Sequence, residues 1–359
     1  YQLLFLDKIP PSAAVNEAVE LTKKCCRNPR AAGMVNGILR AMLRNGELPE
    51  PKGRDKEETL SLKYSHPRWL VEEFTVALGM EGAEALLVEN NCQPSTAAQV
   101  NVLHGSSADL AEALRKDGAE VQPHPWLYNC LLLSGTGDLE RLPPFQNGAF
   151  YIQDAASRLA VAAAGVEPGS RVLDCCAAPG GKSFAAAIDM ENRGEIISCD
   201  IHPHKIKLIE AGRERLGLSI ISPFLQNAAE LREDWLDGFD TVFTDVPCSG
   251  LGIIRKKPDI RYKDPEKLKG LPGVQRRILD NCSRYVRPGG VLLYSTCTLL
   301  RRENEDVVDG FLAAHSQFEL EAFSLSRFGE QPGWVTLWPH VHGTDGFFVA
   351  KLRKRGDAS

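Results

Sequence analysis

The sequence predicts an α/β protein. Its largest domain is expected to be a mostly parallel β-sheet with an antiparallel last strand, preceded by a small α/β domain and a helical unit. From about residue 148 onward, short apolar runs alternate with stretches of helical periodicity. Apolar strands that alternate with helices are typical of a parallel sheet buried on both faces. At 359 residues, the chain has room for two or three domains.

The helical unit is predicted over residues 1–48. Apolar residues recur at helical spacing over residues 12–44, with a break at Asn28-Pro29. The following stretch, residues 49–59, is polar and rich in helix breakers, and we therefore expect it to be a linker.

The small α/β domain is predicted over residues 60–141. A helix is expected to begin just after His66-Pro67, because proline suits the first turn of a helix. A strand, a helix and a second strand are expected to follow, at residues 97–102, 108–116 and 129–133.

The main sheet is predicted within residues 142–355. Five short apolar runs have the length of buried strands, at residues 171–175, 195–200, 220–225, 239–246 and 290–296. Two further strands are expected at residues 334–338 and 346–352, and the last of them is expected to run antiparallel to the others.

A glycine-rich turn closes the first of these strands and opens a helix. Gly180 and Gly181 let the backbone approach a ligand closely, and the helix start offers unpaired N–H groups. A P-loop would need glycine where Cys176 stands, and the dinucleotide pattern Gly-x-Gly-x-x-Gly is missing. A nucleoside site without phosphates remains, for which Asp200 at the end of the next strand can accept both ribose hydroxyls. A simple tight turn between strand and helix is the competing interpretation.

Two cysteines follow two later strands of the predicted sheet. Cys248 comes shortly after the fourth strand and close to Asp245, and Cys297 comes directly after the fifth. A single buried cysteine is more often an inert small apolar residue than a nucleophile. Two thiols at the carboxyl edge of one sheet favour a catalytic role. No histidine lies at ligand spacing from either cysteine, so no metal site is predicted.

These motifs resemble those of the RNA cytosine-5 methyltransferases, most closely the branch that modifies bacterial 16S ribosomal RNA. Three blocks match in order, and two shorter signatures accompany them: residues 176–182, 245–250 and 295–297, with 258–260 and 303–305. Residues 31–40 resemble the carboxyl half of a NusB-like domain. We therefore expect the helical unit to be a partial NusB-like domain whose amino half is missing, which fits a sequence that starts at Tyr1.

The resemblance implies a Rossmann-like methyltransferase sheet, S-adenosylmethionine as cofactor and 16S rRNA as the RNA partner, with methyl transfer to carbon 5 of a cytosine. It implies that Cys297 is the nucleophile that adds to carbon 6, and that Cys248 assists loss of the carbon 5 proton or release of the enzyme. It places Asp245 against cytosine N3 and N4. Cys297 must be partly ionised for this role, and Arg301, Arg302 or Lys182 could lower its pKa.

The cofactor contacts follow from the same resemblance. The residues that it implies are Cys176, Ala177, Ala178, Pro179, Gly180, Gly181, Lys182, Asp200, Asn227 and Asp245. Asn227 departs from the family, which usually has an aspartate there, although an amide can still donate and accept hydrogen bonds.

The charge distribution supports an RNA substrate although the net charge is −5. Between residues 250 and 302, thirteen Lys or Arg face four acidic residues, a local charge of +9 that leaves −14 for the rest. A charge run is usually a solvated face, but this one flanks both cysteines, which favours a surface that follows phosphates. The predicted RNA-binding residues are Arg255, Lys256, Lys257, Arg261, Arg301 and Arg302. The target base must leave any stack to reach Cys297.

Several further expectations concern partners and location. No run of eighteen apolar residues occurs, so we expect no membrane span, and free thiols without any Cys-x-x-Cys pair fit the cytoplasm. We expect a monomer whose small α/β domain contacts RNA. A tRNA cytosine-5 methyltransferase and a non-catalytic RNA-binding factor of ribosome assembly remain as alternatives. The two cysteines argue for an enzyme, and the NusB-like piece favours rRNA.

Overall fold

The computed structural model describes residues 1–28, 30–45, 50–325 and 327–356. The chain divides into two compact units, residues 1–65 and residues 66–359, and each is described by itself. The predicted helix break at Pro29 lies outside the described residues, as do the end of the predicted helical unit and the first residue of the predicted linker at residues 46–49.

The first unit is helical, as predicted for residues 1–48, and it also holds a helix at residues 56–64, where the sequence predicts a linker and the start of the small domain. Its helices are α1 (Gln2–Phe5), α2 (Pro11–Cys25), α3 (Arg30–Asn45) and α4 (Lys56–Tyr64). Helices α2 and α3 contact each other, and α2 buries Ala14 and Val15. Helix α4 begins after Asp55, whose carboxylate accepts a hydrogen bond from the N–H of Glu58 and so satisfies one of the unpaired donors of the first turn.

The second unit begins with helix α5 (Arg68–Asn90) and a four-stranded antiparallel sheet in the order β2-β3-β1-β4. The strands are β1 (Thr96–Val100), β2 (Glu120–Pro123), β3 (Cys130–Ser134) and β4 (Phe150–Ile152), with α6 (Ser107–Lys116), η1 (Leu139–Arg141) and α7 (Pro143–Gln146) between them. Leu110, Leu114 and Leu131 form its core together with Phe150. Strand β4 pairs with β1 although it lies beyond residue 141, where the sequence predicts the small domain to end.

The large sheet follows the order β10-β14-β9-β8-β5-β6-β7, with β13 beside β14. Its parallel strands are β5 (Arg171–Asp174), β6 (Glu195–Asp200), β7 (Ile221–Leu225), β8 (Phe239–Asp245) and β9 (Val286–Thr296). Strand β14 (Phe347–Lys354) runs antiparallel to β9, β13 (Trp334–Leu337) and β10 (Phe318–Leu320). The predicted mostly parallel sheet with an antiparallel last strand is confirmed.

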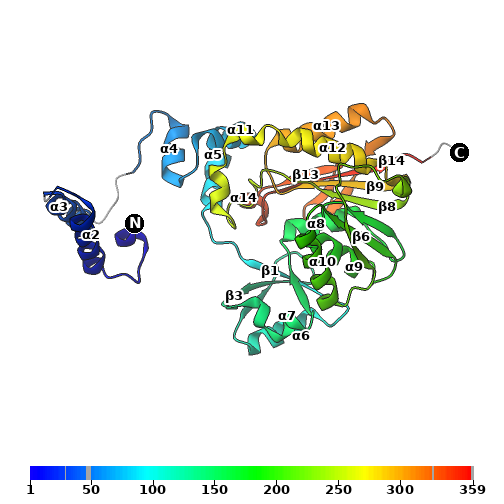
Figure 1. Ribbon diagram of the computed structural model, residues 1–359, viewed down its shortest axis with the longest axis horizontal. Helices are drawn as coiled ribbons and strands as arrows, with labels where there is room; N and C mark the ends of the chain where they lie inside the picture. The colour runs from blue at the N-terminus through cyan, green and yellow to red at the C-terminus, as the bar shows by residue number, and fades with distance from the viewer. Residues whose placement is uncertain (29, 46–49, 326, 357–359) are drawn as a thin grey trace. The chain divides into compact units, whose positions relative to one another are not determined.

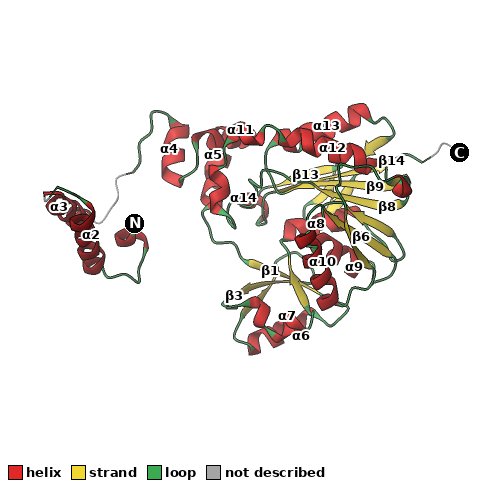
Figure 2. Ribbon diagram, viewed as in Figure 1, coloured by secondary structure: helices red, strands yellow, loops and turns green. Residues whose placement is uncertain are grey.

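Helices cover both faces of the large sheet (Figures 1 and 2). One face packs against α8 (Ala155–Ala164), α9 (Gly181–Asp189) and α10 (Pro203–Leu216), and the other against α12 (Leu271–Ser283) and α13 (Glu305–Ala314). A strand covered by helices on both faces must be apolar on both faces. Consecutive residues of β5 show this, because Val172 joins the core on one face of the sheet and Leu173 the core on the other.

Shorter elements complete the fold. They are η2 (Glu233–Trp235), η3 (Pro258–Tyr262), α11 (Pro265–Leu268), η4 (Arg301–Glu303), α14 (Pro339–His342) and a hairpin of β11 (Phe323–Leu325) and β12 (Gly329–Gln331). None of the helices in the described parts of the chain combines the length and apolar character that crossing a membrane requires.

Candidate active site

The carboxyl ends of β8 and β9 bring the two predicted cysteines together. These strands are parallel neighbours, with Asp245 paired to Ser295, and the segments that follow them place the sulfur atoms of Cys248 and Cys297 3.3 Å apart. The hydrogen bond from Cys248 lowers the pKa of Cys297, assisted by Lys182 and opposed by burial and by Asp245. The same contact raises the pKa of Cys248 well above its ordinary value. Cys297 is therefore the thiol of the pair that ionises first.

Asp245 is held between a cation and a hydroxyl group. Its Oδ2 lies 2.6 Å from Nζ of Lys182, and its Oδ1 accepts a hydrogen bond of 2.8 Å from Ser295 Oγ. The Lys182 side chain is 7% exposed and lies over the ring of Phe347, while that of Asp245 remains 32% exposed. The sequence singled out Asp245 and Lys182 separately but did not indicate that they pair.

Arg301 and Arg302, the other cations predicted to act on the Cys297 thiol, pair elsewhere. Arg301 lies 3.0 Å from Asp306, and Arg302 lies 2.5 Å from Glu73 on α5. Of the three proposed cations, Lys182 is the one whose charge lowers the pKa of Cys297.

A buried Glu-Asn pair ties the two cysteine segments to each other. Oε2 of Glu303 accepts the N–H of Ser249, next to Cys248. Asn304 accepts from Thr296 Oγ1 and donates to the carbonyl of Thr298, on both sides of Cys297. Ser249 and Thr298 also share a hydroxyl contact of 2.6 Å. The sequence indicated residues 303–305 as a family signature but not this positioning role.

Gly252 lies against the backbone of Cys297. Its N–H donates to the carbonyl of Cys297 at 2.9 Å, and its own carbonyl accepts from the N–H of Gly346 at 2.8 Å. A Cβ at Gly252 would lie 2.0 Å from the Gly346 oxygen, so this three-segment contact excludes every side chain.

The predicted cofactor loop, residues 176–182, connects β5 to α9. Gly180 has φ of +110°, and a Cβ there would lie 2.3 Å from the ring of Phe184. The N–H groups of Gly181 and Lys182 begin α9 and have no acceptor among the described residues. Helix starts of this kind leave donors open to a ligand.

Besides Asp245, two further predicted cofactor residues beyond the loop lie at the same edge of the sheet. Asp200 ends β6 and is largely buried, where Oδ1 accepts the N–H of His202 and Oδ2 lies 3.5 Å from Lys205. Asn227 follows β7, and its amide bonds within its own turn, to Glu230 and the N–H of Ala229. Asp200 thus remains well placed, whereas Asn227 has less hydrogen-bonding capacity for a ligand than the sequence suggested.

The predicted RNA-binding residues differ in how far they reach solvent. Arg255 has a side chain that is 8% exposed, 2.5 Å from Glu89 and donating to the carbonyl of Thr344. Arg261 is 6% exposed and donates to Pro258 and to the side chain of Asn91. In these contacts both guanidinium groups already have protein partners, which argues against direct phosphate contacts by Arg255 and Arg261.

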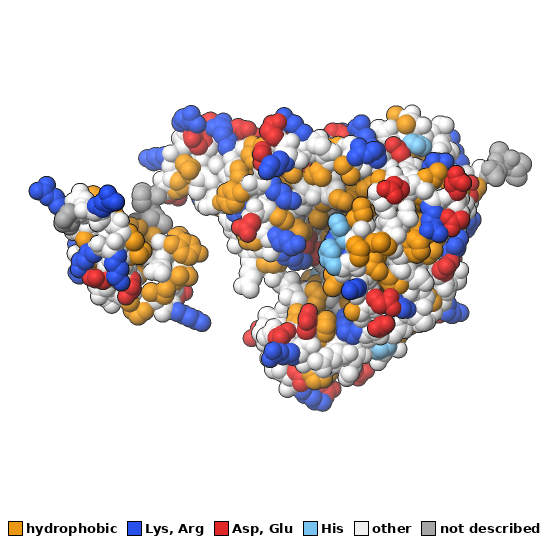
Figure 3. All heavy atoms as spheres, viewed as in Figure 1, with side chains coloured by type: hydrophobic (Ala, Val, Ile, Leu, Met, Phe, Trp, Pro, Cys, Tyr) orange, Lys and Arg blue, Asp and Glu red, His pale blue; other side chains and the backbone are white. Residues whose placement is uncertain are grey.

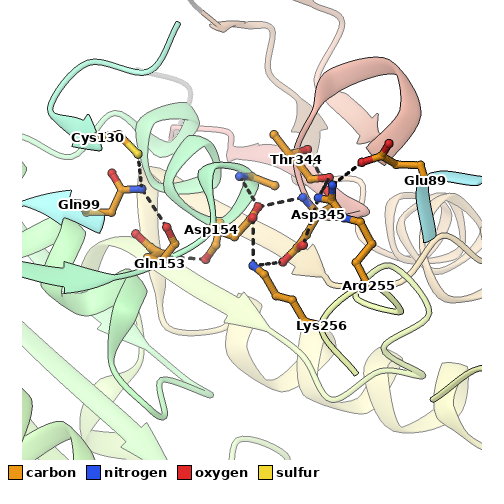
Figure 4. A network of polar contacts seen from close by, with 11 residues as sticks. Glu89, Gln99, Cys130, Gln153, Asp154, Arg255, Lys256, Thr344 and Asp345 are labelled. Atoms are coloured by element: carbon orange, nitrogen blue, oxygen red, sulfur yellow. Dashed lines mark hydrogen bonds and ion pairs between the residues drawn. The ribbon is translucent and has the colours of Figure 1, made fainter. Parts of the chain in front are cut away.

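The two lysines of the predicted RNA-binding set differ in their contacts. Nζ of Lys256 lies 2.6 Å from Asp345 and 3.1 Å from Asp154, within a polar network that also includes Arg255 (Figure 4). Lys257 is exposed. In the part of the chain that the structure describes, no group of three or more His, Cys, Asp or Glu side chains is arranged to hold a metal ion.

Comparisons with known proteins match nearly the whole length of the chain. Family models described as the 16S rRNA methyltransferase RsmB/F, the RsmF/B-like ferredoxin-like domain and the NusB family match residues 162–353, 66–140 and 1–44. The probable ribosomal RNA small subunit methyltransferase B of Bacillus subtilis is 38% identical, over 99% of this chain and 81% of that protein. Its counterpart in Synechocystis is 33% identical over the same shares. The crystal structure of PH0851 has a TM-score of 0.81 and 29% identity, covering 97% of this chain and 79% of its own.

Proposed function

Because the chain belongs to the RsmB/F family of 16S rRNA methyltransferases, we propose that it methylates carbon 5 of a cytosine in 16S rRNA through a covalent bond between Cys297 and carbon 6. Membership of this family also makes it an S-adenosylmethionine-dependent RNA methyltransferase. The single observation that carries the proposal is the pair of thiols 3.3 Å apart at the carboxyl edge of the sheet, and the hydrogen bond with Cys248, which lowers the pKa of Cys297, supports the choice of nucleophile.

The residues at the sheet edge fit the methyl donor. The start of α9 offers the open N–H groups of Gly181 and Lys182, and Asp200 offers a carboxylate one strand away for ribose hydroxyls. We assign the donor to the whole predicted set, residues 176–182 with Asp200, Asn227 and Asp245. S-adenosylmethionine supplies an electrophilic methyl group to this site.

Carbon 5 of cytosine is a poor nucleophile until a thiolate has added to carbon 6. In the proposed step, the Cys297 sulfur forms a bond to carbon 6 and the electron pair of the C5=C6 bond becomes available at carbon 5. Carbon 5 is then nucleophilic toward the methyl group that S-adenosylmethionine would supply, with S-adenosylhomocysteine as the leaving group. The addition places negative charge on the ring near N3. The Lys182–Asp245 pair lies beside the thiols, where the Lys182 ammonium group can donate to N3 and offset that charge, while the Asp245 carboxylate can accept from the N4 amino group.

Release requires removal of the proton that remains on carbon 5. The pKa of Cys248 is raised first of all by its hydrogen bond to Cys297. Once the Cys297 sulfur is bonded to carbon, it is no longer a thiolate that accepts this hydrogen bond, and Cys248 can release its proton to water and become the base. Cys248 then takes the carbon 5 proton, the bond between carbon 6 and sulfur breaks, and Cys297 returns as a thiolate beside 5-methylcytosine.

The test is transfer of labelled methyl groups to ribosomal and transfer RNA, followed by bisulfite sequencing. We expect one modified cytosine in 16S rRNA, no transfer by Cys297→Ala, and a covalent RNA complex on a denaturing gel with Cys248→Ala. Full turnover by Cys297→Ala would refute the nucleophile assignment. Label in tRNA alone would favour a tRNA enzyme, and RNA binding without any transfer would favour a non-catalytic assembly factor.

A further inference from the structure

A cavity of about 480 Å³ lies in the second unit, beside the small antiparallel sheet. Its lining comes from segments far apart in the chain, including the β2–β3 loop and α14, and includes His124, Trp126, Arg255, Arg327, His340 and His342. A volume of this size falls in the range of small-ligand sites. Figure 3 shows histidine side chains gathered at the edge of a recess, with Lys and Arg side chains across from them.

One wall of the cavity is aromatic. The ring of Trp126 lies 4.4 Å from that of His124 and 5.0 Å from that of Phe328, which in turn lies 4.9 Å from His342. Burial lowers the pKa of His124, His340 and His342, so that these rings are neutral at physiological pH. The wall therefore offers flat, uncharged surfaces with polar edges.

Another part of the lining belongs to the polar network of Figure 4, and it holds a donor that no described group satisfies. Arg255 is fixed by Glu89 and the Thr344 carbonyl, yet its buried Nε has no hydrogen-bond partner among the described residues. The buried Nδ1 of His340, on α14, is likewise without a partner there. Buried polar atoms of this kind cost free energy unless a ligand or water meets them.

The cavity is close to the thiol pair along the backbone. Arg255 comes three residues after Gly252, whose N–H donates to the carbonyl of Cys297. Three residues span at most about 11 Å, so the backbone of Arg255, which lines the cavity, lies within about that distance of the backbone contact between Gly252 and Cys297. An RNA strand that places its cytosine at Cys297 therefore passes near the cavity. The charges at the wall nearly balance, because Glu89 and Asp154 accompany Arg255 and Arg327. This balance suits a base better than a phosphate group.

We propose that this cavity binds a nucleobase of the RNA strand next to the target cytosine, stacked on Trp126 and hydrogen-bonded by Arg255 and the histidines. The inference rests on the proposed function, since it names how that same site holds its substrate. Bases of single-stranded RNA are recognised by stacking on aromatic rings and by hydrogen bonds to their edges, which is the chemistry that these two parts of the lining provide.

The test uses oligoribonucleotides that span the methylated cytosine, each with one abasic site at a flanking position. We expect one neighbouring abasic site to lower kcat/KM of the wild-type chain by about 10- to 100-fold, the cost of one lost stacking contact. On intact RNA, Trp126→Ala is expected to have kcat/KM lower by the same factor. The abasic site at that position should not lower it further. Trp126→Phe should retain most of the wild-type kcat/KM on intact RNA and most of the penalty for the abasic site. Tyr128→Ala is the matched control on the same loop, because Tyr128 is 91% exposed and does not line this cavity.

Two measurements distinguish a failure of this inference from a loss of stability and from a failure of the proposed function. Arg327→Ala removes an exposed side chain of the cavity wall and should weaken the abasic effect with an unchanged unfolding temperature. An abasic penalty of the same size in wild type and in both cavity variants would overturn the inference, and so would the lack of any penalty. If the wild type methylates no cytosine, the proposed function fails. The dissociation constants of the same oligoribonucleotides, measured by fluorescence anisotropy, then decide the cavity, and equal values for intact and abasic RNA overturn it.

Discussion

The carboxyl edge of the large sheet and the basic segment over residues 250–302 are both regions that the sequence indicates as functional, but the structure treats them differently. At the sheet edge, residues from separate motifs meet within hydrogen-bond distance, as do Lys182 and Asp245 at 2.6 Å. In the basic segment, Arg255 and Arg261 are almost buried and pair with neighbours, whereas Lys257 is exposed. Cations in the two regions therefore differ in what they contact, and a charge in the sequence does not by itself indicate a functional contact.

The difference has a simple physical origin. Side chains that follow parallel strands share an edge of the sheet because the strand direction is the same, so their order in the sequence predicts their proximity. A count of charges contains no such geometric information. A guanidinium group that finds a buried carboxylate contributes to the fold, and one that finds only water remains available to RNA.

The first prediction compares one lysine from each region. Lys182→Met is expected to lower methyl transfer by about 10³- to 10⁴-fold, or about 4–5.5 kcal/mol, because it leaves Asp245 without its cation and raises the pKa of Cys297. Lys267→Met removes an exposed charge from the basic segment and is expected to change the rate by less than threefold. Single-turnover methyl transfer at pH 7.5 measures both variants.

A pH profile sharpens the same comparison. If Lys182 acts through the Cys297 thiolate, part of the lost rate of Lys182→Met should return between pH 7.5 and pH 9, because a higher pKa then costs less. Equal losses for the two lysine variants would remove the distinction between the regions.

The second prediction separates two cations that lie two positions apart in the basic segment. Arg255→Ala is expected to lower the free energy of unfolding by about 3 kcal/mol, because it leaves Glu89 without its cation and the Thr344 carbonyl without its donor. Lys257→Ala should leave that free energy within about 0.5 kcal/mol. It should instead reduce the salt dependence of RNA binding by about one ion.

Urea unfolding gives the first quantity, and RNA affinity over a series of salt concentrations gives the second. An Arg255→Ala protein that unfolds like the wild type would show that Arg255 is not needed for stability, and a salt dependence of RNA binding reduced by about one ion would identify a phosphate contact.

The fold and the core of the site could be predicted because they depend on local patterns. The five parallel strands are apolar runs, and Gly180, Cys248 and Cys297 come shortly after three of them. Strand β4 could not be predicted in its sheet, since three residues carry too little periodicity and their partner lies about fifty positions earlier. The pair of Arg255 and Glu89 joins positions 166 residues apart, and nothing near either residue indicates it.

Ser295 and the pair Glu303 and Asn304 illustrate an intermediate case. They stand inside recognisable motifs, so their importance was indicated, but their roles depend on which strands become neighbours. Only the register of β8 beside β9 sets Ser295 next to Asp245 and explains its hydrogen bond. Motifs therefore identify residues, while the partners of those residues require the fold.

The smallest expected effect concerns Asp174, a carboxylate buried behind the cofactor loop. Burial raises its pKa from 3.8 to about 6, although Ser183 donates a hydrogen bond to Oδ2, and Oδ1 has no partner among the described residues. Because the folded pKa is raised, the folded state binds more protons than the unfolded state between pH 4 and 6. The contribution of this group to the free energy of unfolding is therefore most favourable below pH 4, falls as the pH rises to 6, and stays lower above it.

Asp174→Asn removes this titration but keeps an acceptor for Ser183. The variant should gain stability relative to the wild type as the pH rises from 4 to 6, by at most about 3 kcal/mol, and the difference should then stay constant. Asp280→Asn, at an exposed carboxylate, serves as the control and should show no such window. Urea unfolding at half-unit pH steps measures the three proteins. A difference that does not vary with pH would mean that Asp174 is ionised or neutral in both states, and that the sheet edge does not hold this carboxyl group as argued.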